Sequence, residues 1–120
     1  MKMNNERREE LIFGAPLNKA YDIERFEGLS LEQLKTLVTE GFAKTRERQN
    51  YSPSIGEFLD YFEDGGVSVT FHGYVVSPER ADTRVSVEGF VCRYADHIVN
   101  DFHHADEFTV YNGWIYAWWD

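Results

Sequence analysis

The chain is poor in cysteine, has no long apolar run and carries few basic residues beyond position 50. Its single cysteine, Cys92, has no partner for a disulfide within the chain, which favours a reducing compartment and predicts a cytoplasmic location. Nowhere do 18 apolar residues occur together, so neither a membrane-spanning helix nor a secretory signal is expected. A length of 120 residues predicts one domain, spanning residues 1–120.

Familiar enzymatic signatures are missing as well. The sequence contains no GxxxxGK[ST], GxGxxG or GxSxG motif, which would indicate a phosphate-binding loop, a dinucleotide-binding fold or a serine hydrolase. It also lacks the HExxH motif and the paired cysteines that accompany many zinc sites. We therefore expect no cofactor, and we favour a protein that is not an enzyme.

Basic charge is concentrated in the first part of the chain. Residues 1–50 hold nine acidic and nine basic residues, whereas residues 51–120 hold twelve acidic residues and three arginines. The net charge of −9 therefore comes from the second part. A negative field repels nucleic acids and anionic membranes, so the alternatives are a basic protein partner or a charge that only maintains solubility.

Aromatic residues, in contrast, are abundant: seven tyrosines, nine phenylalanines and three tryptophans. The most informative stretch is residues 106–119, where Asn112-Gly113 lies between two alternating runs and predicts a β-hairpin with a type I′ turn. The turn places opposite each other Tyr111 and Trp114, Val110 and Ile115, Thr109 and Tyr116, and Phe108 and Ala117.

The two faces of this hairpin differ in their expected roles. The predicted core face holds Phe108, Val110, Ile115, Ala117 and Trp119. The other face holds Glu107, Thr109, Tyr111, Trp114, Tyr116 and Trp118. So many rings on a second face indicate that it is covered by a partner, by a ligand or by residues 1–16 of the same chain.

Helix signals occur in the N-terminal third of the chain. Residues 5–12 can form a short helix, but the charged start and nearby Gly and Pro predict that residues 1–16 are frayed or loosely docked. A stronger signal begins at Ser30, which is placed to form a capping box with Gln33, and ends at Gly41. Its predicted buried stripe is Leu31, Leu34, Leu37 and Val38.

Two further helices are predicted. One opens at Ser52-Pro53, with the serine as N-cap, and ends at Gly65-Gly66. The other covers residues 95–106 with Asp96 as its cap. Their predicted apolar positions are Ile55, Phe58, Leu59 and Phe62 in the first, and Ile98, Val99, Phe102 and Ala105 in the second.

Between these two helices the apolar period changes to two, which predicts strands over residues 67–76 and 84–92. The connection between them carries Pro and Asp and predicts a long antiparallel hairpin. Two registers keep the valines on one face: Phe71 opposite Gly89, which we favour, or Gly73 opposite Gly89. In both, the glycines lie on the core face, where a helix backbone can approach closely.

Together these elements predict an α+β fold. It consists of two N-terminal helices, then a four-stranded, largely antiparallel sheet made of two hairpins, with a third helix between the hairpins. Helices are expected to cover the valine face of the sheet.

The favoured register brings together one pair with possible acid–base chemistry. His72 lies opposite Glu88 on the non-valine face, and a carboxylate beside an imidazole stabilises its protonated form, so His72 is a candidate base oriented by Glu88. We favour the simpler interpretation of an ordinary cross-strand pair, because no nucleophile motif accompanies it. Cys92, two positions along the strands, is expected to be a small buried hydrophobe.

Possible metal ligands occur on the third predicted helix. His97, Asp101 and His104 have the spacing i, i+4 and i+7, and two histidines with a carboxylate can bind zinc or iron. Asp106 or Glu107 can add a ligand. This spacing arises readily by chance in a polar helix, so we expect no metal there.

Three segments of the second half carry a resemblance to known proteins. They are SPSIGEFLDYFE at 52–63, HGYVVSPERADTRVSVEG at 72–89, and ADEF followed by the terminal YAWWD. In their pattern of SPSxxEF, HGYxVSPER and ADEF with YAWWD, they resemble a family of small uncharacterised bacterial single-domain proteins. The resemblance implies a bacterial, cytoplasmic single domain and transfers no catalytic residue.

These observations lead to two hypotheses of different classes. The favoured one is a non-enzymatic protein-interaction module, like an immunity protein or antitoxin, that docks a basic partner. Its predicted contact residues are Tyr111, Trp114, Tyr116, Trp118, Tyr74 and Phe90. The alternative is a small ligand-binding domain or enzyme with its pocket around His72 and Glu88, and homodimerisation through the aromatic face is a further possibility.

Overall fold

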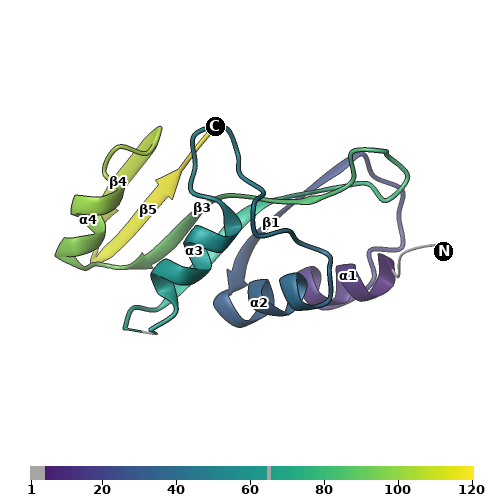
Figure 1. Ribbon diagram of the computed structural model, residues 1–120, viewed down its shortest axis with the longest axis horizontal. Helices are drawn as coiled ribbons and strands as arrows, with labels where there is room; N and C mark the ends of the chain where they lie inside the picture. Colours follow the sequence, from purple (N-terminus) through teal and green to yellow (C-terminus); the bar gives the residue numbers. More distant parts are fainter. Residues whose placement is uncertain (1–4, 65) are drawn as a thin grey trace.

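The computed structural model describes residues 5–64 and 66–120, and these residues form four helices and five strands (Figure 1). In chain order the elements are α1 (Asn5–Phe13), β1 (Ile23–Ser30), α2 (Leu31–Thr39), α3 (Ile55–Phe62), β2 (Val69–Val76), β3 (Val85–Arg93), α4 (Asp96–Phe102), β4 (Glu107–Tyr111) and β5 (Trp114–Trp118). The predicted α+β class is confirmed, and the sheet has one strand more than predicted. No helix in this described part of the chain is long and apolar enough to cross a membrane.

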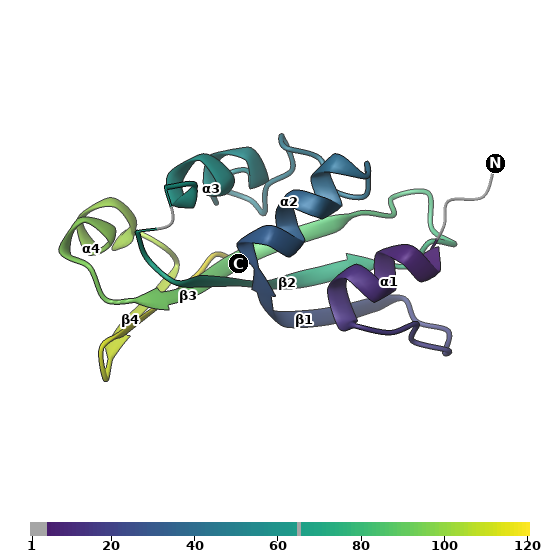
Figure 2. The ribbon, with the colours of Figure 1, turned by 90° about the horizontal axis from the view of Figure 1, so that it is seen from below.

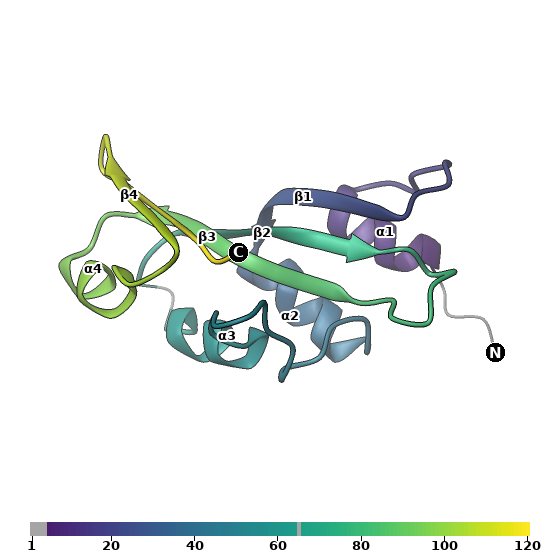
Figure 3. The same ribbon diagram turned by 90° about the horizontal axis from the view of Figure 1, so that it is seen from above.

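All five strands belong to one antiparallel sheet in the order β1-β2-β3-β5-β4. The helices lie on one side of the sheet, as two opposite edge-on views show (Figures 2 and 3). We call the other side the open face, because no described helix covers it. The β4–β5 hairpin bends away from the rest of the sheet toward this side (Figure 3).

The core between helices and sheet is built largely from aromatic rings. Trp119 packs against Phe58 and Phe102, with ring centroids 5.8 and 6.1 Å apart. Phe90 of β3 lies 5.2 Å from Phe62 of α3, and all five rings are buried. Such edge-to-face pairs contribute about 0.5–1.5 kcal/mol each beyond their burial. The end of the chain therefore helps to close the core.

The terminal hairpin has the predicted register. Tyr111 lies opposite Trp114, and Asn112 and Gly113 both have positive φ, as a type I′ turn requires. The predicted core face is confirmed for three residues, Ile115, Ala117 and Trp119, which are buried. Phe108 is half-buried and Val110 is exposed, because β4 is an edge strand that extends past the helices.

Helices α2 and α3 both begin with a capping box, which two side chains three positions apart form. Ser30 and Gln33 form the predicted capping box of α2. In α3 the N-cap is Ser54, which forms a capping box with Glu57, so the prediction of Ser52 as N-cap is wrong. Ser52 instead lies in the preceding turn, where its Oγ accepts a hydrogen bond from the Gln49 N–H. The predicted end at Gly65-Gly66 falls partly outside the described residues, and α3 ends at Phe62.

Helix α4 is shorter than predicted. It spans Asp96–Phe102, and its N-cap position is Ala95, so the prediction of Asp96 as cap is wrong. The Asp96 carboxylate instead accepts a hydrogen bond from the Tyr94 hydroxyl at 2.6 Å. The apolar stripe is confirmed at Ile98 and Phe102, which are buried.

Residues 1–16 were expected to be frayed or loosely docked, and the described part of them forms helix α1, which is docked with Arg8, Glu9 and Ile12 buried. Its Arg8 is only 1% exposed and fastens the helix to the β2–β3 hairpin. The Arg8 guanidinium donates hydrogen bonds to the Val76 carbonyl at 3.1 Å and to the hydroxyls of Thr83 and Tyr21. The expectation for residues 1–4 lies outside the described residues. The charged residues of this stretch were a reason to predict fraying, yet one of them, Arg8, anchors the helix.

Strand β1 was not predicted from the sequence, because its apolar residues do not alternate. Phe26 and Leu29 are both buried although they are three positions apart, a spacing typical of a helix. A register shift between these two residues, with Gly28 at φ +70°, brings both onto the core face. The strand runs directly into α2 at Ser30.

The β2–β3 hairpin is antiparallel as predicted, and the favoured register is confirmed near the connection, where Tyr74 lies opposite Ser86 and Val75 lies opposite Val85. Farther along the strands that register is wrong, and the alternative register, with Gly73 opposite Gly89, is not formed. His72 lies opposite Gly89, Phe71 lies opposite Phe90, and Gly73 lies opposite Val87. A β-bulge causes this shift, because it gives β3 one residue more than β2 over the same length.

Beyond the bulge, each residue of β3 lies on the opposite side of the sheet from the one that regular alternation predicts. Phe90 and Cys92 belong to the core rather than to the non-valine face. The role predicted for the glycines is also wrong, because sheet backbone and not a helix approaches them. A Cβ on Gly89 would lie 2.0 Å from the Ala117 carbonyl oxygen, and one on Gly73 would lie 1.9 Å from the oxygen of Ser86.

Candidate binding groove on the open face

The strand register arranges the open face as three rows that cross the sheet. The first row is Glu107, Trp118, Gly89 and His72, the second is Thr109, Tyr116, Val91 and Thr70, and the third is Tyr111, Trp114 and Arg93. Strand β5 therefore contributes three aromatic rings, at every second position, which we call the aromatic column (Trp114, Tyr116 and Trp118).

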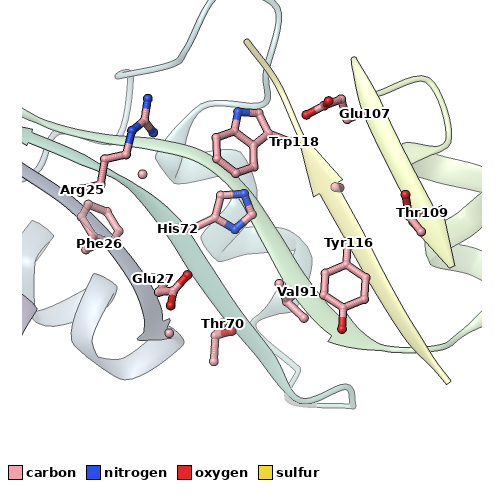
Figure 4. A pocket seen from close by; sticks show the side chains of 13 residues that line it. Arg25, Phe26, Glu27, Thr70, His72, Val91, Glu107, Thr109, Tyr116 and Trp118 are labelled. Carbon is pink, nitrogen blue, oxygen red and sulfur yellow. The ribbon is translucent and has the colours of Figure 1, made fainter. Parts of the chain in front are cut away.

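A groove of about 640 Å³ crosses the first two rows (Figure 4). Its lining includes Thr70, His72, Val91, Tyr116 and Trp118 from the three central strands. Strand β1 borders it on one side with Glu27, and β4 borders it on the other with Glu107 and Thr109. The groove thus has aromatic side chains along its middle and a carboxylate at each side, and Arg25 also lines it on the β1 side.

His72 lies in the middle of this groove, against the indole of Trp118. The centroids of the two rings are 4.7 Å apart, and Figure 4 shows the imidazole and the indole side by side. The His72 Nε2 atom is buried and has no hydrogen-bond partner among the described residues. Burial, and secondarily the positive charge of Arg25, lower the pKa of His72 to about 4. The imidazole is therefore neutral at pH 7.

The predicted pairing of His72 with Glu88 is wrong. Glu88 is buried and forms an ion pair with Arg25 of β1, while His72 lies opposite Gly89. The bulge is the cause, because it moves Glu88 one position away from the partner that regular alternation would give it. The two residues therefore do not form a base oriented by a carboxylate.

Arginine side chains cover the two ends of the aromatic column. The Arg25 guanidinium lies 5.8 Å from the ring centre of Trp118, and that of Arg93 lies 4.8 Å from the ring centre of Trp114. Both distances are typical of cation–π contacts. Between them Tyr116 is 43% exposed, and Tyr111 on the neighbouring strand is 65% exposed.

The described part of residues 1–16 does not cover this face. Helix α1 packs beside α2 on the opposite side of the sheet (Figure 2). Of the contact residues predicted from the sequence, Tyr111 and Tyr116 are exposed, and Trp114 and Trp118 are half-buried. These four lie together on β4 and β5, as the hairpin pattern predicts.

The other two predicted contact residues, Tyr74 and Phe90, are buried and cannot meet a partner. The Tyr74 hydroxyl donates a hydrogen bond to Gln49 Oε1 at 2.9 Å and accepts one from Arg84 at 3.0 Å. Phe90 is in the core because the bulge turns it there. Cys92 is buried beside it, and burial raises the pKa of its thiol to about 12, so the thiol is unreactive at neutral pH.

The three possible metal ligands are not assembled into a site. His97 stacks on Tyr61, and the Asp101 carboxylate accepts a hydrogen bond from the Tyr61 hydroxyl. His104 lies beyond the end of α4, so the i, i+7 spacing no longer places it on the same helix face. Over residues 5–64 and 66–120, no group of three or more His, Cys, Asp or Glu side chains is arranged to hold a metal ion.

Two groove residues, Arg25 and Glu27, were missed from the sequence because β1 itself was missed. The signal that was present is Gly28, two residues before the N-cap Ser30 of α2, because a glycine at this place allows a bulge at the end of an edge strand. Without β1, the sequence offers no reason to place Arg25 beside Glu88.

Comparisons of the chain with protein-family models, with curated proteins and with solved structures find no match.

Proposed function

We propose that the protein is a non-enzymatic interaction module whose open face docks a basic segment of another protein. The observation that carries the proposal is the groove, on a sheet face that no described helix covers. Its middle holds the exposed Tyr116 and the half-buried Trp118, and its sides hold Glu27 with Arg25 on β1 and Glu107 on β4. A cytoplasmic protein of the immunity or antitoxin type is the kind of protein that fits this proposal.

The residue types on the open face support a protein partner. Tyrosine, tryptophan and arginine are the side chains that contribute most to binding energy at protein interfaces. The open face presents Tyr111 and Tyr116 to solvent, with Trp114 and its stacked Arg93 beside them. Tyr116, the uncovered ring in the middle of the aromatic column, is the residue we expect to contribute most.

The charges support a basic partner. The chain has a net charge of −9, and the groove has Glu27 on one side and Glu107 on the other. The chain's own Arg25 illustrates the chemistry, because its guanidinium meets an indole face and a carboxylate at once. A partner's basic side chains would find an uncovered ring at Tyr116 and a carboxylate at Glu107, in neighbouring rows of the open face.

A charged peptide of known sequence provides the first test. We expect octa-arginine to bind the chain in calorimetry, and octa-glutamate not to bind. Amide shifts on titration should centre on β5 and β4. Tyr116→Ala and Glu107→Gln should each weaken binding about fivefold or more, the loss typical of an interface hot spot.

Tyr51→Ala is the matched control, because Tyr51 is 92% exposed and does not line the groove. Its affinity for octa-arginine should equal that of the wild type. Shifts spread over all acidic surfaces, or equal losses in the Tyr51 and Tyr116 variants, would mean that the peptide senses only net charge, and the proposal would fail.

A small-ligand pocket is a second candidate, favoured by the volume of the groove and by the unpartnered Nε2 atom of His72. Because the predicted His72–Glu88 pair is not formed, this candidate is a binding site rather than an acid–base centre. A fragment screen by NMR decides it: hits that shift His72 and compete with octa-arginine would favour the ligand, and no hit in the groove would remove this candidate.

A further inference from the structure

Strand β4 is an edge of the sheet, and its outer backbone groups have no partner. In a hairpin with a two-residue turn, Tyr111 and Trp114 exchange hydrogen bonds, so the N–H and C=O groups of Phe108 and Val110 point away from β5. Within the described residues no other backbone hydrogen bond is made by these groups. Two donors and two acceptors are therefore free along this edge.

This edge lacks several of the features with which proteins usually block strand addition, although β4 is only five residues long and carries one charged residue, Glu107. Residues 107–111 contain no proline, no lysine and no bulge. Two large side chains are accessible, because Val110 is 45% exposed on the side of the core and Tyr111 is exposed on the open face. The turn end of the hairpin also projects from the body of the molecule, away from the side of the sheet that α2 and α3 cover (Figures 2 and 3).

We propose that two copies of the chain associate through β4, in antiparallel pairing centred on Thr109. This register places Thr109 opposite its own copy, Phe108 opposite Val110, and Glu107 opposite Tyr111. Phe108 and Val110 then exchange hydrogen bonds with their counterparts, roughly four in all, and satisfy the free groups of both edges. The two sheets join into one, and the open faces of both copies lie on the same side.

Charge disfavours the register centred on Glu107, which would set two carboxylates opposite each other. Centred on Thr109, the pairing sets the Glu107 carboxylate opposite a tyrosine. It also covers the exposed Val110 with an apolar side chain from the other copy. Each copy still carries a net charge of −9, so the dimer should strengthen with added salt as the repulsion is screened. This inference does not depend on a docked partner.

Cysteine cross-linking tests the register. The Thr109 pair would be non-hydrogen-bonded, with Cα atoms about 4.5 Å apart, which a disulfide can span. Thr109→Cys should therefore form a covalent dimer in air with a copper catalyst under native conditions, where the buried Cys92 thiol does not react. Glu107→Cys and Tyr111→Cys should each cross-link poorly alone and efficiently when mixed. Tyr51→Cys, at an exposed site far from β4 in the sequence, is the control for random collision.

Sedimentation of the unmodified chain tests association itself. We expect a dimer whose population rises with protein concentration. Its dissociation constant should fall when the salt concentration is raised from about 0.05 M to about 0.5 M. Val110→Pro should weaken it about tenfold or more, since the lost N–H faces outward and the hairpin keeps its own bonds, and Val110→Thr should retain the dimer. A monomer at every concentration, cross-linking of Thr109→Cys no faster than that of Tyr51→Cys, or a dimer insensitive to Val110→Pro in a folded variant would each overturn the proposal.

Discussion

Acidification is expected to destabilise the fold through His72 in particular. The side chain has a pKa near 6.5 when unfolded and about 4 when folded, because burial against Trp118 disfavours the charged imidazole. As the pH falls below 6.5, the unfolded chain therefore binds a proton that the folded chain does not. The stability that His72 contributes is complete above pH 6.5 and is lost as the pH falls through that value toward 4.

The size of this effect follows from the two pKa values. Each unit of difference corresponds to 1.36 kcal/mol, so the proton taken up by the unfolded state lowers the free energy of unfolding by about 2 kcal/mol at pH 5 and about 3 kcal/mol at pH 4. A domain of this length has only about 5–15 kcal/mol in total. A single histidine in the groove would thus remove a substantial part of the stability.

Urea denaturation of the wild type and of His72→Phe, at pH 7, 6, 5 and 4, measures the contribution. All other groups titrate in both proteins, so the difference between the two curves should change by about 3 kcal/mol between pH 7 and pH 4, whatever its value at pH 7. His104→Gln, at an exposed histidine, should follow the wild type. Parallel curves for the wild type and His72→Phe, or an NMR titration of His72 near pH 6.5, would refute the reasoning.

Three other predictions concern packing and reactivity. Gly89→Ala should cost about 3 kcal/mol in urea denaturation because its Cβ would meet sheet backbone, and Gly66→Ala, with nothing closer than 3.5 Å, should change little. Equal stability of the two variants would contradict the close approach. Arg8→Ala should lower the free energy of unfolding by about 2–3 kcal/mol and expose α1 to limited proteolysis, because the hydrogen bonds of Arg8 are lost. Unchanged stability and protease resistance would show that these hydrogen bonds do not hold the helix. The Cys92 thiol should react with Ellman's reagent only after denaturation, and rapid reaction of the native protein would show that it is accessible.

Elements set by short stretches of sequence were predictable. The Asn112-Gly113 turn determines the pairing of the terminal hairpin, because only residues that tolerate positive φ fit a type I′ turn. Ser30 and Gln33 mark the start of α2 for a similar reason, since the capping box needs those two side chains three positions apart. The placement of Ser54 rather than Ser52 as cap of α3 could also have been found, because Glu57 follows Ser54 at the same spacing.

The groove could not be predicted, because it depends on two departures from alternation. In β1, Phe26 and Leu29 share a face only because of a bulge that contains Gly28. In β3, the bulge moves Glu88 away from His72 and turns Phe90 into the core. Regular alternation therefore predicts the wrong neighbours on both strands, and the Arg25–Glu88 pair follows from no pattern within either strand alone.

The bulge in β3 also limits where single codons can be inserted or deleted in the gene. Losing the codon for Glu88 would straighten the strand and exchange the sides of Phe90 and Val91, which would empty a core position and expose a ring. Gaining or losing a codon in the 77–84 connection leaves the alternation of both strands intact. We therefore expect related genes to tolerate insertions and deletions at this connection, and to keep the number of codons between Val87 and the end of β3 unchanged.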